Sequence, residues 1–223
     1  KLVMGQASSG ALKGVRGPLS SLIHVSGQYV TAIETALGAA ASNLVVETAQ
    51  HGKLAIQMLK KRDGGRATFL PMDTIRPQSL RESGLEQNKG FCGVAADLVD
   101  CDADYRDIVD NALGRTVVAQ DMDCALAIAR SYRNRFRIVT LDGQLINAGG
   151  SMTGGSAGRS SGILSRANQL EQMQERARVQ QEKLDRLTAR GTQLAEDAKQ
   201  HEQDAARMGT ALAEQRQKLA ALS

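Results

Sequence analysis

Residues 137–166 read RIVTLDGQLINAGGSMTGGSAGRSSGILSR, and this stretch separates two parts of the chain that differ in composition. It begins with two β-prone runs, 138–141 and 144–146, joined by Asp142-Gly143, a pair that favours a two-residue type I′ hairpin turn. Six glycines follow between residues 149 and 162, and after them the chain is rich in Gln, Glu, Arg, Ala and Leu without proline. The stretch therefore predicts the end of a folded lobe, a glycine-rich joint and the start of a long helix.

The helix predicted after the joint carries a seven-residue apolar repeat. With a at residue 170 and d at residue 173, twelve of the sixteen a and d positions are apolar, against eight of the other thirty-seven up to residue 222. A 3.5-residue period over more than seven heptads is typical of a left-handed coiled coil. Four residues interrupt this apolar stripe and are expected to weaken it or fix its register: Gln180, Gly191, His201 and Gln215.

The part before the joint contains an internal repeat. GVRGPLSSLIHV at 14–25 aligns with GFCGVAADLVDC at 90–101, and the offset of 76 residues continues to Ala-Leu-Gly at 36–38 and 112–114. With four extra residues in the first copy, the alignment then gives these pairs: Val45-Val46 with Val117-Val118, Leu54-Ala55-Ile56 with Leu126-Ala127-Ile128, and, one residue later, Arg66 with Arg137 and Leu70 with Leu141. Two copies are too few for a solenoid, so we expect two packed lobes related by approximate two-fold symmetry.

Each copy is expected to form a helix, a strand, a second helix and a second strand. The expected ranges are helices at 28–37 and 105–113, strands at 44–46 and 116–118, helices at 52–61 and 123–133, and strands at 67–70 and 138–141. We expect Gly38 and Gly114 to end the first helix of each copy as C′ glycines. Strands that alternate with helices predict small α/β (α+β) lobes, joined by a linker that contains Pro71 and Pro77.

Composition restricts the possible functions. Tryptophan is absent and aromatic residues make up 3%, so few rings are available to stack on bases, while the net charge of +4 is compatible with an anionic partner. The spacing of Cys92, Cys101 and Cys124 does not fit a zinc site and predicts free thiols in a reducing compartment. We find no spacing of a catalytic triad, a Cys/His pair or paired carboxylates, and no apolar run of membrane-spanning length.

The glycine-rich joint has three interpretations. A glycine loop between a strand and a helix has the general form of a phosphate cradle, which would make 149–158 a nucleotide site, although neither GxGxxG nor GxxxxGK[ST] occurs there. Alternatively, the glycines let two backbones approach closely, and Leu145-Ile146-Asn147 is an edge strand that pairs with another chain. The third interpretation is that the glycines only form turns before the coil.

Several blocks of this sequence resemble the hinge domain of bacterial-type SMC (structural maintenance of chromosomes) proteins, chromosome-organising ATPases with long coiled-coil arms. TLDGQLINAGGSMTGGS and GILSR resemble the end of that domain, and blocks at 14–23, 32–47 and 65–73 match upstream parts in the same order. The resemblance implies this organisation: the end of an incoming coiled-coil helix at 1–11, hinge lobe 1 at 12–72, an inter-lobe linker at 73–89, hinge lobe 2 with the joint at 90–162, and an outgoing coiled-coil helix at 163–223.

The resemblance implies a homodimerisation module that joins two SMC arms for chromosome condensation and segregation, as in condensin. The implied interface residues are Leu145, Ile146, Asn147, Gly149, Gly150, Gly154 and Gly155. The partner helix of the coil would end near residue 6, so most of it would be missing from this fragment. In the family, ATP binds to head domains elsewhere in the protein, which implies no enzymatic activity and no cofactor here.

The resemblance also implies modest DNA contact without sequence preference, a cytoplasmic and nucleoid-associated location, and no membrane partner. The local basic groups that could contact phosphates are Lys13, Arg16, Lys60, Lys61, Arg62, Arg66, Lys89, Arg159 and Arg166. Relatives often carry several lysines after the TGG element, whereas here only Arg159 lies between Gly155 and Arg166. We therefore expect weaker binding, and each group could instead be solvated surface.

Overall fold

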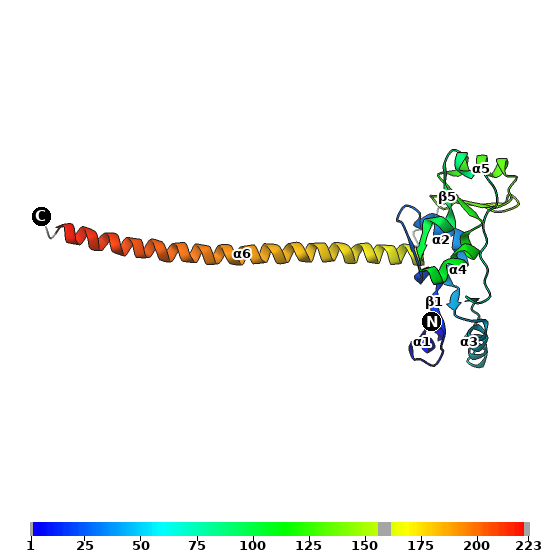
Figure 1. Ribbon diagram of the computed structural model, residues 1–223, viewed down its shortest axis with the longest axis horizontal. Helices are drawn as coiled ribbons and strands as arrows, with labels where there is room; N and C mark the ends of the chain where they lie inside the picture. The colour runs from blue at the N-terminus through cyan, green and yellow to red at the C-terminus, as the bar shows by residue number, and fades with distance from the viewer. Residues whose placement is uncertain (1, 156–161, 221–223) are drawn as a thin grey trace. The chain divides into compact units, whose positions relative to one another are not determined.

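The computed structural model of the chain describes residues 2–155 and 162–220 (Figure 1). The chain divides into two compact units, Lys1–Gln169 and Leu170–Ser223. The first unit contains the repeat and the glycine-rich joint, and the second contains most of the long helix. No helix in the described parts is both long and apolar enough to span a bilayer.

The predicted order of helix, strand, helix and strand is found in both copies, and each copy also begins with two strands that were not predicted. A short helix, α1 (Leu2–Ser8), precedes the first copy. The first copy contains β1 (Val15–Pro18), β2 (Ile23–Val25), α2 (Val30–Leu37), β3 (Leu44–Val46), α3 (Ala49–Lys61) and β4 (Phe69–Pro71). The second contains β5 (Phe91–Val94), β6 (Val99–Cys101), α4 (Arg106–Leu113), β7 (Thr116–Ala119), α5 (Met122–Ser131) and β8 (Arg137–Thr140). The elements after the second copy are β9 (Leu145–Ile146), β10 (Met152–Thr153) and α6 (Ile163–Ala220).

Three sheets hold the first unit together. The strand orders are β1-β3-β4, β10-β9-β8-β7-β5 and β2-β6. β3 pairs with β4 in parallel, as β7 pairs with β8, and the other pairs are antiparallel. The second copy therefore repeats the three-stranded arrangement of the first and adds β9 and β10 beside β8.

The two copies share one hydrophobic core. In β7, Val117 and Ala119 face α5, whereas Val118 faces the cluster that contains α2 and α4, so both faces of this sheet are covered. Helix α2 of the first copy packs against β8 of the second, where the Arg137 guanidinium donates a hydrogen bond to the Ala36 carbonyl at 3.0 Å. Figure 1 shows α2 and α4 next to each other, between α5 and α3. The predicted lobes are therefore interlocked by their central helices.

Strand register corrects the predicted alignment of the copies. Val45 lies opposite Gly17 and Val118 lies opposite Gly93, so Val45 corresponds to Val118 and the first copy has three extra residues, not four. By the same reasoning, Leu70 corresponds to Val139 and not to Leu141. A run of similar aliphatic residues does not reveal a one-residue shift, because the register is set by the ladder of backbone hydrogen bonds.

One of the two predicted glycine roles and one turn differ from the prediction. Gly38 has φ +49° and ends α2 as expected, but Gly114 has φ −66° and does not need a left-handed conformation. A Cβ at Gly114 would overlap the carbonyl oxygen of Gln78, so glycine is needed there because the linker passes close by. In the β8–β9 turn only Gly143 has positive φ, and the loop has three residues instead of the predicted type I′ form.

The predicted long helix is confirmed as one continuous helix of 58 residues, about 87 Å long at 1.5 Å per residue. Large side chains of the apolar stripe are more than half exposed: Leu170, Met173, Leu184, Leu187, Leu194, Met208 and Leu212. A stripe of this kind is completed by a partner helix. The coiled-coil pairing stays a prediction.

Candidate interface site

The joint folds back on the sheet, which makes β10 the edge strand. β9 lies between β8 and β10, and Ile146 is 2% exposed within the core of its own chain. The prediction that Leu145-Ile146-Asn147 forms an edge strand is therefore wrong. The sequence does not reveal this because Met152 and Thr153, a run of only two residues between glycines, pair with Ile146 and Leu145.

The backbone of β10 offers hydrogen-bonding groups to a further strand. The Asn147 N–H donates to the Ser151 carbonyl at 2.8 Å, so Asn147 and Ser151 form a hydrogen-bonded pair of the antiparallel ladder. The next pair, Ile146 with Met152, is then a non-hydrogen-bonded pair. This alternation directs the N–H and C=O of Met152 away from β9. The Met152 side chain is 62% exposed, so the strand is open in the single chain.

Gly149 and Gly150 form the turn that leads into β10. Their φ angles are +91° and +93°, which a residue with a side chain adopts at a cost. The Gly149 N–H donates to the Asn134 carbonyl, and the Gly150 N–H donates to the Asn147 carbonyl, both at 2.9 Å. These two predicted interface glycines thus have a structural role within their own subunit.

Gln144 holds the other end of β10, and the sequence reasoning did not single it out. The Gly155 N–H donates to Gln144 Oε1 at 2.9 Å, and Gln144 Nε2 donates to the Gly155 carbonyl at 3.2 Å. A Cβ at Gly154 would overlap Gln144 Oε1, so Gly154 makes room for this contact. No pattern around Gln144 indicates this role, because the residue that it holds is eleven positions away.

The first copy has an open edge where the second copy is covered. β4 ends the three-stranded sheet, and its side chains are half-buried. Its counterpart β8 is followed in its sheet by β9 and β10, which have no equivalent in the first copy. Among the sheet edges of the chain, β10 and the outer side of β4 therefore differ from each other in position and composition.

The joint does not support the phosphate-cradle interpretation. Such a cradle needs several backbone N–H groups that are free to bind an anion. In the described part of the joint, the N–H groups of Gly149, Gly150 and Gly155 already donate within the chain.

Most of the predicted basic residues gather around α3. Lys60, Lys61 and Arg62 are exposed at its C-terminal end, where positive charge also favours the helix dipole. Lys13 lines a shallow groove against the outer face of α3, and Arg66 is exposed after it. Arg16 pairs with Glu47 at 3.0 Å, and both side chains are largely exposed, so part of its charge is offset.

The other predicted basic residues are not part of this group. Lys89 precedes β5, near Asp121 of the second copy. Arg166 is exposed in the first turns of α6. Arg159 lies outside the described residues.

A second basic group follows α5 and was missed. Arg130, Arg133 and Arg135 are exposed at or just after the C-terminal end of α5, which corresponds to α3 in the repeat. The C-terminal ends of the two helices correspond, because the Arg62 N–H donates to the Met58 carbonyl as the Tyr132 N–H donates to the Ile128 carbonyl. Residues 60–62 therefore correspond to 130–132, and transferring the first basic group through the repeat would have found Arg130 but not Arg133 or Arg135.

The three cysteines are free, and each is a poor nucleophile near neutral pH. Burial raises the pKa of the Cys92 and Cys101 thiols, and the hydrogen bond with Asp121 raises the pKa of Cys124. Within residues 2–155 and 162–220, no group of three or more His, Cys, Asp or Glu side chains could hold a metal ion.

Residues 12–129 match the family model described as the SMC proteins Flexible Hinge Domain, so this chain belongs to the SMC hinge family. Similar proteins are named chromosome partition protein Smc. That of Bacillus subtilis (strain 168) is 40% identical over 176 residues, which cover 77% of this chain and 15% of that protein. That of Desulfitobacterium hafniense (strain Y51) is 39% identical over 184 residues, with coverage of 80% and 15%. The chain thus spans about a seventh of the length of these relatives.

Solved structures agree with this assignment and confirm the predicted fold class. An asymmetric dimer of the Geobacillus stearothermophilus SMC hinge domain gives a TM-score of 0.76 at 38% identity, covering 83% of this chain and 75% of that one. The Pyrococcus furiosus SMC hinge domain gives 0.60 at 33% identity, with coverage of 73% and 85%.

Proposed function

We propose that this hinge is a homodimerisation module that joins two SMC subunits for chromosome condensation and segregation. The observation that carries the proposal is the pair of complementary open edges, β10 and β4, in one chain. Unpaired strand edges associate readily with another strand. The similar Geobacillus stearothermophilus hinge domain, described as an asymmetric dimer, supports dimerisation.

In the proposed dimer, β10 of each protomer pairs with β4 of its partner. The three-stranded sheet of one protomer is thereby extended by the five-stranded sheet of the other, twice around a two-fold axis. Because the two β10–β4 pairings are related by the two-fold axis, both edges of each protomer are used and the arrangement closes. In this arrangement, the glycines at 149 and 150 form the turn that leads into β10, and those at 154 and 155 allow the contact with Gln144 that holds its other end.

Met152→Glu tests the dimer. A charge on the exposed edge strand is expected to oppose strand pairing, as charges on natural edge strands do. Ile56→Glu, on α3, is the matched control because Ile56 is an apolar residue with similar exposure, 54% against 62%. We expect light scattering of residues 1–169 to give a dimer for the native sequence and for Ile56→Glu, and a folded monomer for Met152→Glu. A dimer for all three would contradict the role of β10.

We further propose a modest DNA contact, without sequence preference, through the basic residues around α3. Lys60 and Lys61 are expected to neutralise phosphates and release counterions, so duplex binding should weaken as salt rises. Changing both to Gln is expected to reduce the slope of log affinity against log salt by about 0.9 for each phosphate that is no longer neutralised. Lys183→Gln with Arg186→Gln, exposed on α6, is the charge-matched control. Binding that does not depend on salt, or equal slopes, would contradict this contact.

We also propose that the ATPase lies in head domains outside this chain, so that the hinge acts mechanically and needs no cofactor. The apolar stripe of α6 pairs with an incoming helix of the same arm. The whole protein would be cytoplasmic and associated with the nucleoid.

A further inference from the structure

The linker between the copies is fixed to the second copy on both sides of residues 79–82. Before them, the Asn111 side chain donates to the Arg76 carbonyl at 2.8 Å, and Gly114 leaves room for the Gln78 carbonyl. After them, the Tyr132 hydroxyl donates to the Ser83 carbonyl at 3.0 Å. The segment is therefore held by α4 and by the residues that follow α4 and α5, Gly114 and Tyr132, and does not behave as a loose spacer.

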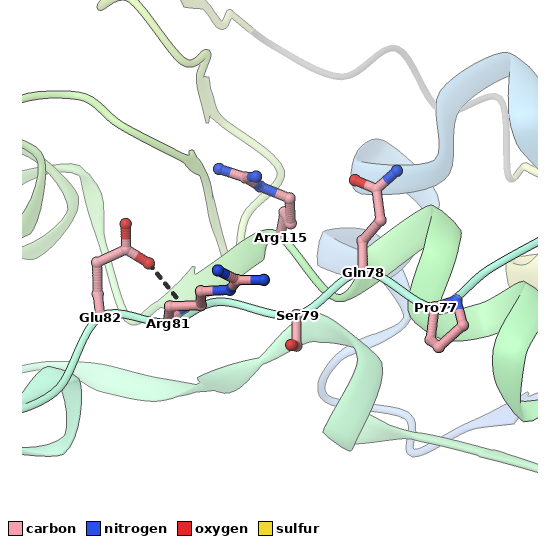
Figure 2. Close-up of a pocket in the computed structure, with 6 residues that line it drawn as sticks. All are labelled: Pro77, Gln78, Ser79, Arg81, Glu82 and Arg115. Atoms are coloured by element: carbon pink, nitrogen blue, oxygen red, sulfur yellow. Dashed lines mark hydrogen bonds between the residues drawn. The ribbon is translucent and has the colours of Figure 1, made fainter.

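An open pocket lies between these fixed points (Figure 2). Its lining residues are Pro77, Gln78, Ser79, Arg81, Glu82 and Arg115. Its volume is about 370 Å³, which is enough for a small ion and its waters, since a water molecule occupies about 30 Å³.

Two arginines from different elements meet at this pocket. Arg81 comes from the linker and Arg115 from the residue before β7. Glu82 also lines the pocket, and its carboxylate accepts the backbone N–H of Arg81 at 3.0 Å instead of pairing with either guanidinium. Figure 2 shows the Arg81 side chain extending along the linker toward Ser79, away from this carboxylate. Within the described residues, neither guanidinium has an ion-pair partner.

We propose that this pocket binds a phosphate group. Two like charges that line one pocket repel each other, and an anion between them removes that cost. A planar carboxylate is satisfied by one bidentate arginine, whereas a tetrahedral phosphate offers enough oxygens for two guanidinium groups approaching from different directions. The Ser79 hydroxyl and the Gln78 amide supply further donors in the same lining. The site involves neither β10 nor α3, so it is independent of the proposed dimer and of the proposed DNA contact.

The test is an NMR titration of the whole chain with inorganic phosphate at constant ionic strength. We expect saturable shifts of the Ser79, Arg81 and Arg115 amide signals. Arg81→Gln with Arg115→Gln should weaken binding at least tenfold, whereas Lys183→Gln with Arg186→Gln, exposed on α6, should change it less than twofold. All these side chains are exposed, so the variants are expected to fold, and a thermal melt checks this. Shifts that do not saturate, or equal affinity in the Arg81/Arg115 double variant, would overturn the proposal.

A second arm identifies the source of the phosphate. If it belongs to a nucleic acid backbone, the Arg81/Arg115 double variant lowers the salt slope of duplex oligonucleotide binding by about one relative to the Lys183/Arg186 control, and inorganic phosphate competes. If it is a free phosphate, the Arg81/Arg115 double variant loses phosphate binding while its oligonucleotide binding matches that of the Lys183/Arg186 control.

Discussion

At the scale of single residues, the glycine-rich joint depends on the backbone conformation or the space that each glycine provides. Gly149 and Gly150 adopt left-handed conformations that turn the chain back onto β9, and Gly154 leaves room for the Gln144 side chain. Substituting all four joint glycines together would therefore disturb the turn as well as any interface. Single substitutions such as Gln144→Ala, which leave Gly149 and Gly150 unchanged, separate an effect on the turn from an effect on the interface.

Gln144→Ala tests whether the side-chain clamp on Gly155 positions β10. The change removes two hydrogen bonds at the protein surface, each worth about 0.5–1.5 kcal/mol. If β10 is the dimer edge, we expect the dimer Kd to rise about five- to tenfold in sedimentation equilibrium. Gln144→Glu keeps the acceptor for the Gly155 N–H and should give an intermediate value. An unchanged Kd for Gln144→Ala would show that β10 needs no such support.

At the scale of elements, the sequence predicts the features that depend on the apolar pattern within one segment better than those that depend on pairing between strands. The strand 44–46 and the long helix agree with the structure because their apolar periodicity lies within the segment itself. The edge strand was assigned wrongly because the position of β9 depends on Met152 and Thr153 folding back beside it. The turn type and the repeat offset failed for a similar reason, since neighbouring strands determine both.

The heptad pattern of α6 makes a prediction about Gly191, which occupies an a position. Gly191→Leu is expected to gain helix propensity, about 1 kcal/mol, together with an apolar contact across the coil. Gly209→Leu, at an e position, gains the same propensity without a central contact and is the matched control. Circular dichroism melts of residues 170–223 at several concentrations should show a larger, concentration-dependent rise for Gly191→Leu. Equal rises for the two variants would argue against this heptad register.

At the scale of the whole molecule, the interlocked copies explain how one chain carries two different edges. The shared core combines residues of both copies, and α2 of the first copy lies against β8 of the second. The start of α6 belongs to the same unit, where Leu164 is buried in this core and Gly162 leaves room for the Glu34 carboxylate of α2. The two edges, and the beginning of the outgoing helix, are thus fixed to one rigid core.

The most direct test of the proposed dimer is a disulfide between β10 of one protomer and β4 of the other. Cysteine at position 152 is combined in turn with cysteine at 69, 70 or 71, with each single variant as its control. Paired strands bring Cα atoms to about 4.5–5.5 Å, within the range that a disulfide bridges. We predict that at least one combination gives a covalent dimer under mild oxidation while the single variants do not. A dimer in solution that forms no such bond in any combination, or links only 152 to 152, would contradict the proposed pairing of β10 with β4.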